Sequence, residues 1–303
     1  MTMDFSLTTY SRLLKALQKS GYTFQTFEQF ITDPLDKVVT LRHDVDRLPG
    51  NALRMARLEH EMGIAASYYF RAVPMSFDPG VMEEIAGLGH EIGYHYENLD
   101  CVIQGLRNSG IEGEGSAAFN VQRSVLEKLK RKVPKEADKE KLINLGYEDF
   151  CRNLERFRKN FEIKTICMHG SPLSRYDNRM IWEKYDYREL GILAEPYFDV
   201  DFAQVFYLTD TGRSWNHKSA SVRDRVGYEN LGIQELRDLG IEKLLRCHST
   251  NEVIAAVDSN KFPQKAMINA HPQRWHDRPW PWLKELVGQN VKNVIKAIIV
   301  KRR

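Results

Sequence analysis

Along this chain, short apolar runs typical of buried strands alternate with segments whose apolar residues recur at the three-to-four-residue spacing of helices. Residues 38–46, VVTLRHDVD, form a short β-branched run of the kind found in buried parallel strands. Residues 48–63 start with a Pro-Gly turn and carry apolar side chains at helical spacing. A strand over 64–73, a helix over 76–89 and a strand over 90–97 repeat this order. Strands that alternate with helices predict a parallel sheet, either open or closed as a barrel.

The pattern is interrupted after the third of these strands and then resumes. Residues 100–146 are rich in Gly, Ser, Lys and Glu, and we interpret them as a helical insertion that covers one end of the sheet as a lid. The remaining predicted elements are a helix over 6–20, a helix over 147–161, strands over 164–170, 204–212 and 265–272, and a helix over 249–260 that starts with a capping box of Ser249 and Glu252. We expect a single domain over 1–303.

Residues 279–303 predict a terminal helix with an apolar stripe and a basic end. Such a helix suits contact with an anionic membrane surface. A helix that docks on the barrel and leaves its lysines in solvent shows the same stripe, and we favour this second interpretation because the stripe is ordinary for a core-facing helix.

Composition excludes several classes of protein. The net charge of +3 is too small to indicate a nucleic-acid partner. The cysteines, Cys101, Cys151, Cys167 and Cys247, are scattered, which favours reduced thiols in a cytoplasmic protein. Neither a signal-peptide core nor an apolar window of about 18 residues occurs, so we expect no secretion and no membrane span.

Two carboxylates stand at the end of the first predicted strand. Asp44 and Asp46 share one face of that strand, while His43 and Val45 share the other. Function in parallel sheets and barrels gathers where the strands end. Paired carboxylates at such a place predict a bound cation, or a division of work between a base and a ligand.

Further polar groups follow the other predicted strands. His95 and Glu97 share one face at the end of the strand over 90–97, so in a barrel this pair could face the first one. His169, Asp210 with Arg213, and His271 before Pro272 follow three later strands. Five polar clusters at one edge of a sheet predict a functional site there.

The motifs RHDVD, GHEIGYH and NAHP, in this order and spacing, resemble the polysaccharide deacetylase superfamily, the NodB-homology group of carbohydrate esterases. They are most similar to the HDVD branch associated with bacterial O-antigen, lipopolysaccharide and surface-polysaccharide biosynthesis. The resemblance covers roughly residues 38–275. It implies an α/β fold, a distorted or incomplete seven-stranded (β/α) barrel, and a hydrolase that removes an acetyl group from a sugar.

The resemblance also implies roles for individual residues. Asp44 matches the general base, Asp46 a metal ligand, His95 the first metal histidine and His271 the general acid. Leu99 stands where the family has its second metal histidine. For the third ligand we favour His169 slightly, because it offers an imidazole, and keep Glu97, which lies on the face of His95, as the alternative.

The implied reaction needs a divalent metal ion, with zinc first and iron, manganese or cobalt as alternatives. The ion would polarise the acetamide carbonyl and lower the pKa of water, Asp44 would take a proton, and His271 would act on the leaving amine. We assign Arg213, Asp210 and Trp215 to substrate binding, with His43 as a supporting member of this group.

Two other functions remain open from the sequence. One is a different metal-dependent hydrolase on the same barrel, an amidohydrolase or a phosphoesterase. The other is a non-catalytic sugar-binding or scaffold protein with a degenerate metal site, which the leucine at position 99 suggests.

Overall fold

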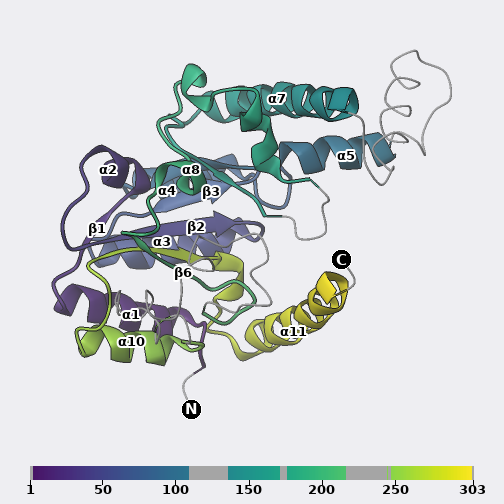
Figure 1. Ribbon diagram of the computed structural model, residues 1–303. Coiled ribbons are helices and arrows are strands. Elements are labelled where there is room, and N and C mark those ends of the chain that lie inside the picture. Colours follow the sequence, from purple (N-terminus) through teal and green to yellow (C-terminus); the bar gives the residue numbers. More distant parts are fainter. Residues whose placement is uncertain (1–2, 109–135, 171–175, 216–243, 245–246, 302–303) are drawn as a thin grey trace.

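One parallel sheet organises the molecule. The computed structural model describes residues 3–108, 136–170, 176–215, 244 and 247–301 (Figure 1). In these ranges seven strands form a sheet of order β5-β4-β3-β2-β7-β6, with β1 paired to the start of β2, and every pair is parallel. The strands are β1 (Thr23–Gln25), β2 (Val38–Val45), β3 (Ser67–Phe70), β4 (Glu91–Tyr96), β5 (Ile166–Met168), β6 (Phe206–Thr209) and β7 (Lys265–Ala270).

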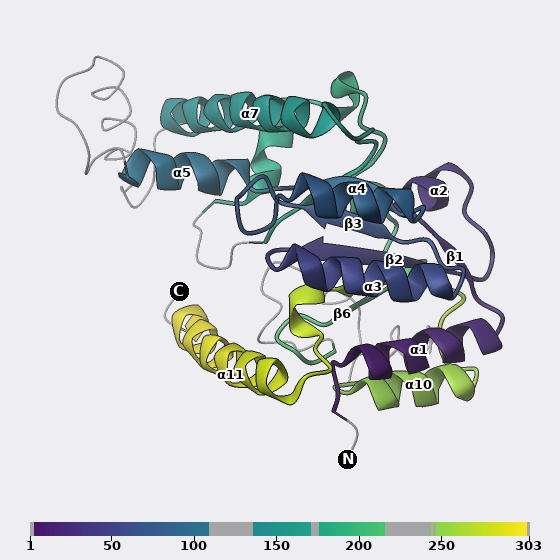
Figure 2. The ribbon, with the colours of Figure 1, turned by 180° about the vertical axis from the view of Figure 1, so that it is seen from behind.

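Helices connect and flank these strands. The α-helices of the described ranges are α1 (Leu7–Lys19), α2 (Phe27–Thr32), α3 (Pro49–Glu61), α4 (Pro79–Gly87), α5 (Asn98–Asn108), α7 (Glu136–Arg158), α8 (Pro196–Asp199), α10 (Thr250–Asp258) and α11 (Pro279–Lys301). Helix α1 lies beside α10, and α5 lies beside α7 (Figures 1 and 2). None of the helices described is long and apolar enough to cross a membrane.

The sheet is curled but not closed. Strands β5 and β6 form its two edges and do not pair with each other within the described ranges. The expectation of an α/β fold with a parallel, barrel-like sheet is therefore confirmed as a curled half-barrel.

The two faces of the sheet pack against different partners. Along β2, Val39, Leu41 and Val45 point into the large core, which also contains the inward faces of α1, α3, α4, α7 and α10. Val38, on the opposite face, belongs to a smaller cluster with Phe27 of α2. This alternation follows from the two-residue period of a strand, and it turns Asp44 toward the concave face, opposite the face covered by α1, α3, α4, α7 and α10.

Gly93 gives the concave face room for a tyrosine ring. A side chain at this position of β4 would place its Cβ 2.4 Å from the ring of Tyr69 on β3, and Tyr69 hydroxyl lies 2.8 Å from Thr165 Oγ1. The glycine therefore allows the Tyr69 ring to cross β4, a close approach that only a residue without Cβ permits.

The starts of two predicted helices are capped by side chains. The Asp78 side chain accepts a hydrogen bond from the Val81 backbone at the start of α4, and Ser249 and Glu252 form the predicted capping box of α10. These bonds satisfy backbone N–H groups that have no partner inside the helix.

Other elements differ from the sequence prediction. The short β1 and α2 were not predicted. Part of the segment interpreted as an insertion, 100–146, belongs to α5 and α7, which pack side by side, while 109–135 lies outside the described residues. As expected, α11 docks on the rest of the protein, through Trp282 among others, and leaves Lys284 and Lys292 exposed. Its apolar stripe is exposed at Trp280 and Val287, so the expectation that the stripe faces the core is wrong.

Candidate metal centre and active site

Ionisable residues directly follow six of the seven strands described. Because these strands are parallel, their last residues meet at one edge of the sheet, here called the carboxyl edge. The residues that follow β2, β3, β4, β5, β6 and β7 are Asp46, Arg71, Glu97, His169, Asp210 and His271. The predicted gathering of polar groups at this edge is therefore present.

Asp46, His95 and His169 converge on one point of the carboxyl edge. Asp46 Oδ1 lies 3.2 Å from His169 Nδ1 and 3.7 Å from His95 Nε2. The two imidazole nitrogens are 3.2 Å apart. All three potential ligand atoms lie within 4.8 Å of one another, so these residues could hold a metal ion.

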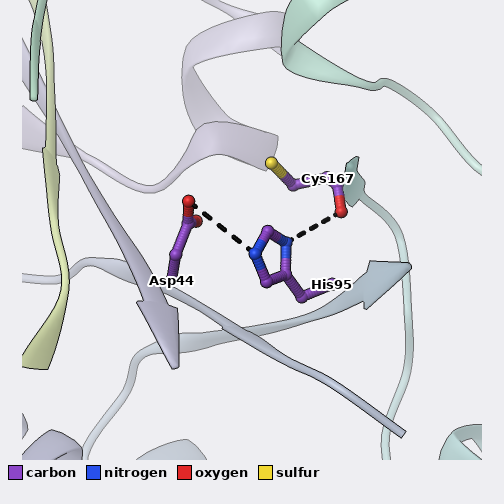
Figure 3. A group of neighbouring side chains, drawn as sticks. All are labelled: Asp44, His95 and Cys167. Carbon is purple, nitrogen blue, oxygen red and sulfur yellow. Dashed lines mark hydrogen bonds and ion pairs between the residues drawn. The ribbon is translucent and has the colours of Figure 1, made fainter. Parts of the chain in front are cut away.

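The ring of His95 is oriented as a metal-binding histidine requires. Its Nδ1 lies 3.0 Å from the backbone carbonyl of Cys167, which fixes a proton on Nδ1 and leaves the lone pair on Nε2 (Figure 3). Burial lowers the pKa of His95 to about 4. The imidazole is therefore neutral near pH 7, the form that binds metals.

Asp46 supplies the observation that best fits a cation. Its Oδ2 accepts a hydrogen bond of 2.8 Å from Gln273 Nε2, whereas Oδ1 is buried and accepts no hydrogen bond with suitable geometry. Burial alone would raise the pKa of Asp46, but His169 beside it holds the pKa well below its ordinary value. A buried, charged oxygen that faces two imidazole nitrogens, at 3.2 and 3.7 Å, matches the donor set of a divalent transition metal.

Both carboxylate oxygens of Glu97 accept hydrogen bonds from Arg71. Arg71 Nε donates to Glu97 Oε1 at 2.7 Å, and Arg71 Nη2 donates to Glu97 Oε2 at 2.6 Å. A third nitrogen, Nη1, donates to the backbone carbonyl of Asp46 at 3.2 Å. Of the two candidates left open by the sequence, the structure brings His169 into the group with Asp46 and His95, and places Glu97 in an ion pair beside it.

Leu99 has a packing role. It is fully buried at the start of α5, in a small apolar cluster with Leu142 and Ile181. Its side chain lies against Gly146 of α7, so closely that a Cβ at Gly146 would be 2.5 Å away. Leu99 therefore anchors α7 on α5.

Asp44 is held by a bidentate arginine on its own strand. Arg42 donates to Oδ1 at 2.9 Å and to Oδ2 at 2.6 Å, and Asn269 Nδ2 donates to Oδ2 at 2.9 Å. Burial opposes ionisation, but the Arg42 guanidinium keeps the pKa of Asp44 well below its ordinary value. Asp44 Oδ2 lies 3.9 Å from His95 Nε2, which places this ionised carboxylate beside the candidate metal ligands.

A second group, Asp44, His95 and Cys167, also meets the distance requirement for a metal (Figure 3). It shares His95 with the first group. Because the Asp44 oxygens already accept bonds from Arg42 and Asn269, this group has less free ligand capacity.

His271 is oriented by Asp210 across the neighbouring strands β7 and β6. Its Nδ1 lies 2.6 Å from Asp210 Oδ1, and its Nε2 lies 4.0 Å from Asp44 Oδ2. Burial opposes ionisation of Asp210, but Arg274 and His271 lower its pKa. An ionised carboxylate only accepts hydrogen bonds, so the proton sits on Nδ1 and Nε2 is directed to the site.

Three of the predicted substrate-binding residues lie apart from this centre. His43 is fully buried on the opposite face of β2, with its Nε2 2.7 Å from Glu59. Trp215 is fully buried and donates to Thr250. Arg213 donates to the backbone of Trp282 in α11. Trp215 therefore presents no ring surface on which a sugar could stack.

Sequence reasoning missed the residues that hold the others in place. These are Arg42, Arg71, Asn269, Gln273 and Arg274. The alternation of side chains along a strand could have pointed to two of them, since Arg42 shares a face with Asp44, and Asn269 shares one with His271. Arg71 lay inside the strand predicted over 64–73, so its place directly after β3 was not visible from the sequence.

The chain was also compared with known proteins. No protein-family model matches it, and no curated protein is similar to it.

Proposed function

We propose that this protein is a metal-dependent hydrolase that removes an acetyl group, N-acetyl in the first place, from a sugar of a bacterial surface polysaccharide or its precursor. The observation that carries the proposal is the convergence of Asp46 Oδ1, His95 Nε2 and His169 Nδ1, all within 4.8 Å of one another at the carboxyl edge. The choice of an acetylated sugar rests on the resemblance of RHDVD, GHEIGYH and NAHP to the polysaccharide deacetylases.

One carboxylate and two imidazoles are the ligands that zinc takes in hydrolases, and they also suit iron, manganese and cobalt. A bound ion would supply Lewis acidity to an acyl carbonyl and lower the pKa of water at the site. The three ligands come from β2, β4 and β5, so the curled sheet itself fixes their spacing.

Asp44 is the proton acceptor in this proposal. It stays ionised throughout the working pH range because Arg42 and Asn269 stabilise the carboxylate. Those contacts also make it a weak base, so it needs water whose pKa has already been lowered.

His271 is the proton donor. Hydrolysis of an acetamide forms a bond between the water oxygen and the carbonyl carbon and breaks the bond from that carbon to nitrogen. Asp44 receives one proton from the water, and His271 Nε2 gives a proton to the departing amine, which yields acetate and a free amino sugar. The bond from His271 Nδ1 to Asp210 stabilises the charged imidazolium before that transfer.

Acetate release by metal-loaded protein tests the proposal. The protein is stripped with a chelator, reloaded separately with zinc, manganese, cobalt and ferrous iron, and given N-acetylated and O-acetylated sugars in free, nucleotide-linked and lipid-linked form. We expect metal-dependent acetate release from an N-acetylated member, lost in Asp46→Ala and His271→Ala. Phosphoesters form a parallel arm, and hydrolysis there without any acetate release would replace the deacetylase with a phosphoesterase.

A further inference from the structure

Helix α11 exposes a continuous apolar stripe. Trp280, Leu283, Val287 and Val291 are 74%, 43%, 55% and 54% exposed. Their spacing of three and four residues puts them on one face of the helix. Four of the nine large hydrophobic side chains exposed in the described part of the chain lie on this one face, which is more than scattered surface residues would give.

The face of α11 that contacts the protein is mixed: Trp282 and Leu286 are half-buried, Trp282 Nε1 donates to the backbone carbonyl of Asp4, and the remaining contacts are polar. Gln289 is buried, Glu285 Oε2 accepts a 2.6 Å hydrogen bond from Arg47, and Asn293 donates to the backbone of Gly212 at 2.9 Å. Core-facing helices bury the apolar face and expose the polar one. Apart from the half-buried Trp282 and Leu286, α11 shows the reverse, so its exposed apolar stripe is available to a partner outside the described molecule.

The charge of this segment selects the kind of partner. Residues 279–303 contain six basic residues and one acidic residue, Glu285, a net charge of +5 in a chain whose total is +3. Glu285 is turned inward to Arg47, whereas Lys284 and Lys292 are exposed. The outer face of the described helix therefore combines apolar side chains with positive charge only.

We propose that the apolar stripe of α11 binds the surface of an anionic phospholipid bilayer, with the helix lying in the plane of the interface. Tryptophan, leucine and valine on one face and lysines beside them are the features of helices that lie in this region. Anionic headgroups attract the basic segment. A second copy of the chain would instead bring two segments of the same strong charge together.

The contacts of α11 place it beside the carboxyl edge. Arg47 follows Asp46, and Gly212 and Arg213 follow β6, and all three bond to this helix. Both views show α11 on the side of the molecule toward which β2 points (Figures 1 and 2). A bilayer bound by α11 would thus lie near the candidate site. The membrane proposal itself does not depend on the reaction catalysed there.

Vesicle co-sedimentation of the full chain tests the proposal. We expect the protein to sediment with vesicles of equimolar phosphatidylglycerol and phosphatidylcholine, much less with phosphatidylcholine alone, and less at high salt. The double variant Val287→Glu/Val291→Glu should lower affinity for the anionic vesicles by about tenfold or more, because it puts carboxylates on the lipid-facing stripe.

Leu35→Glu is the matched control. Leu35 is an exposed leucine shortly before β2, at the opposite end of that strand, and this variant should bind vesicles as the unchanged protein does. No sedimentation above the vesicle-free level, or equal binding by the Val287→Glu/Val291→Glu protein, would overturn the proposal. The proposal would also be overturned if the protein does not bind vesicles but forms a dimer that Val287→Glu dissociates.

Discussion

Arg71 binds Glu97 through two hydrogen bonds of 2.6 and 2.7 Å, and this ion pair leaves His169 as the group that completes the candidate metal centre. Each residue stands directly after its strand, so the pair also ties the ends of β3 and β4 together. The arrangement separates two residues between which sequence reasoning yielded only a slight preference for His169.

Metal content should distinguish these two residues. We expect His169→Ala to lower affinity for zinc by more than about 100-fold, because it removes a ligand, a greater loss than a supporting residue causes. Glu97→Gln keeps the shape of the side chain and should stay within about tenfold of the unchanged protein. Metal analysis after dialysis measures both, and a larger loss in Glu97→Gln than in His169→Ala would exchange their roles.

The pair of Asp210 and His271 predicts a kinetic defect without metal loss. Asp210→Asn removes the charge that holds the proton on His271 Nδ1, so kcat should fall by about 100-fold or more. Zinc content should be unchanged, since neither residue belongs to the metal group. Steady-state kinetics on the substrate found in the acetate screen measures the effect. An unchanged kcat and an unchanged pH profile would remove His271 from the proton-transfer step.

Arg42 should matter mainly for stability. It is buried, and Arg42→Met leaves the Asp44 carboxylate charged in the interior, which should cost about 3–5 kcal/mol in the free energy of unfolding. The variant Arg42→Met/Asp44→Asn removes the charge as well and should recover part of that loss. Urea denaturation measures each value.

Arg57 provides the control for this experiment. Its ion pair with Glu84 has both side chains 56% exposed, so Arg57→Met should cost less than about 1 kcal/mol. If Arg42→Met and Arg57→Met lower the free energy of unfolding equally, the buried Asp44 carboxylate is not the cause of the loss in Arg42→Met.

Glu195 predicts a pH-dependent stability. Burial raises its pKa from 4.5 to about 7 in the folded protein. Between these two values the folded state holds the proton that the unfolded state has released, so stability falls as pH rises through this window and is level above it. The shift in the pKa of Glu195 changes the free energy of unfolding by about 3 kcal/mol across this window. Glu195→Gln should flatten this slope in urea denaturation series, and an unchanged slope would assign it to other groups.

The sequence predicted most of the sheet because the signals were local. Short β-branched runs such as 38–45 and 265–270 and the capping residues Asp78 and Ser249 are fixed by neighbours in the chain. The strand β1 has three residues and owes its existence to pairing with β2, so a periodicity argument had nothing to detect.

For the site, the alternation of side chains along a strand placed Asp44 and Asp46 on one face and His43 on the other. The structure likewise places His43 on the face of β2 opposite Asp44. The same alternation also favoured Glu97, but it could not show that Arg71, from another strand, would occupy that carboxylate. The stripe of α11 looked like a core-facing surface because periodicity gives the spacing of apolar residues and not the direction in which they point.

The shortness of β5 gives the candidate metal centre a second consequence. This edge strand has three residues and pairs only with β4 among the named strands, yet His169 follows it directly. An ion shared by Asp46, His95 and His169 would act as a cross-link between the middle of the sheet and its edge. Ligand binding and edge-strand order would then be thermodynamically linked, so that fraying of β5 releases the ion and saturation with the ion suppresses hydrogen exchange in β5.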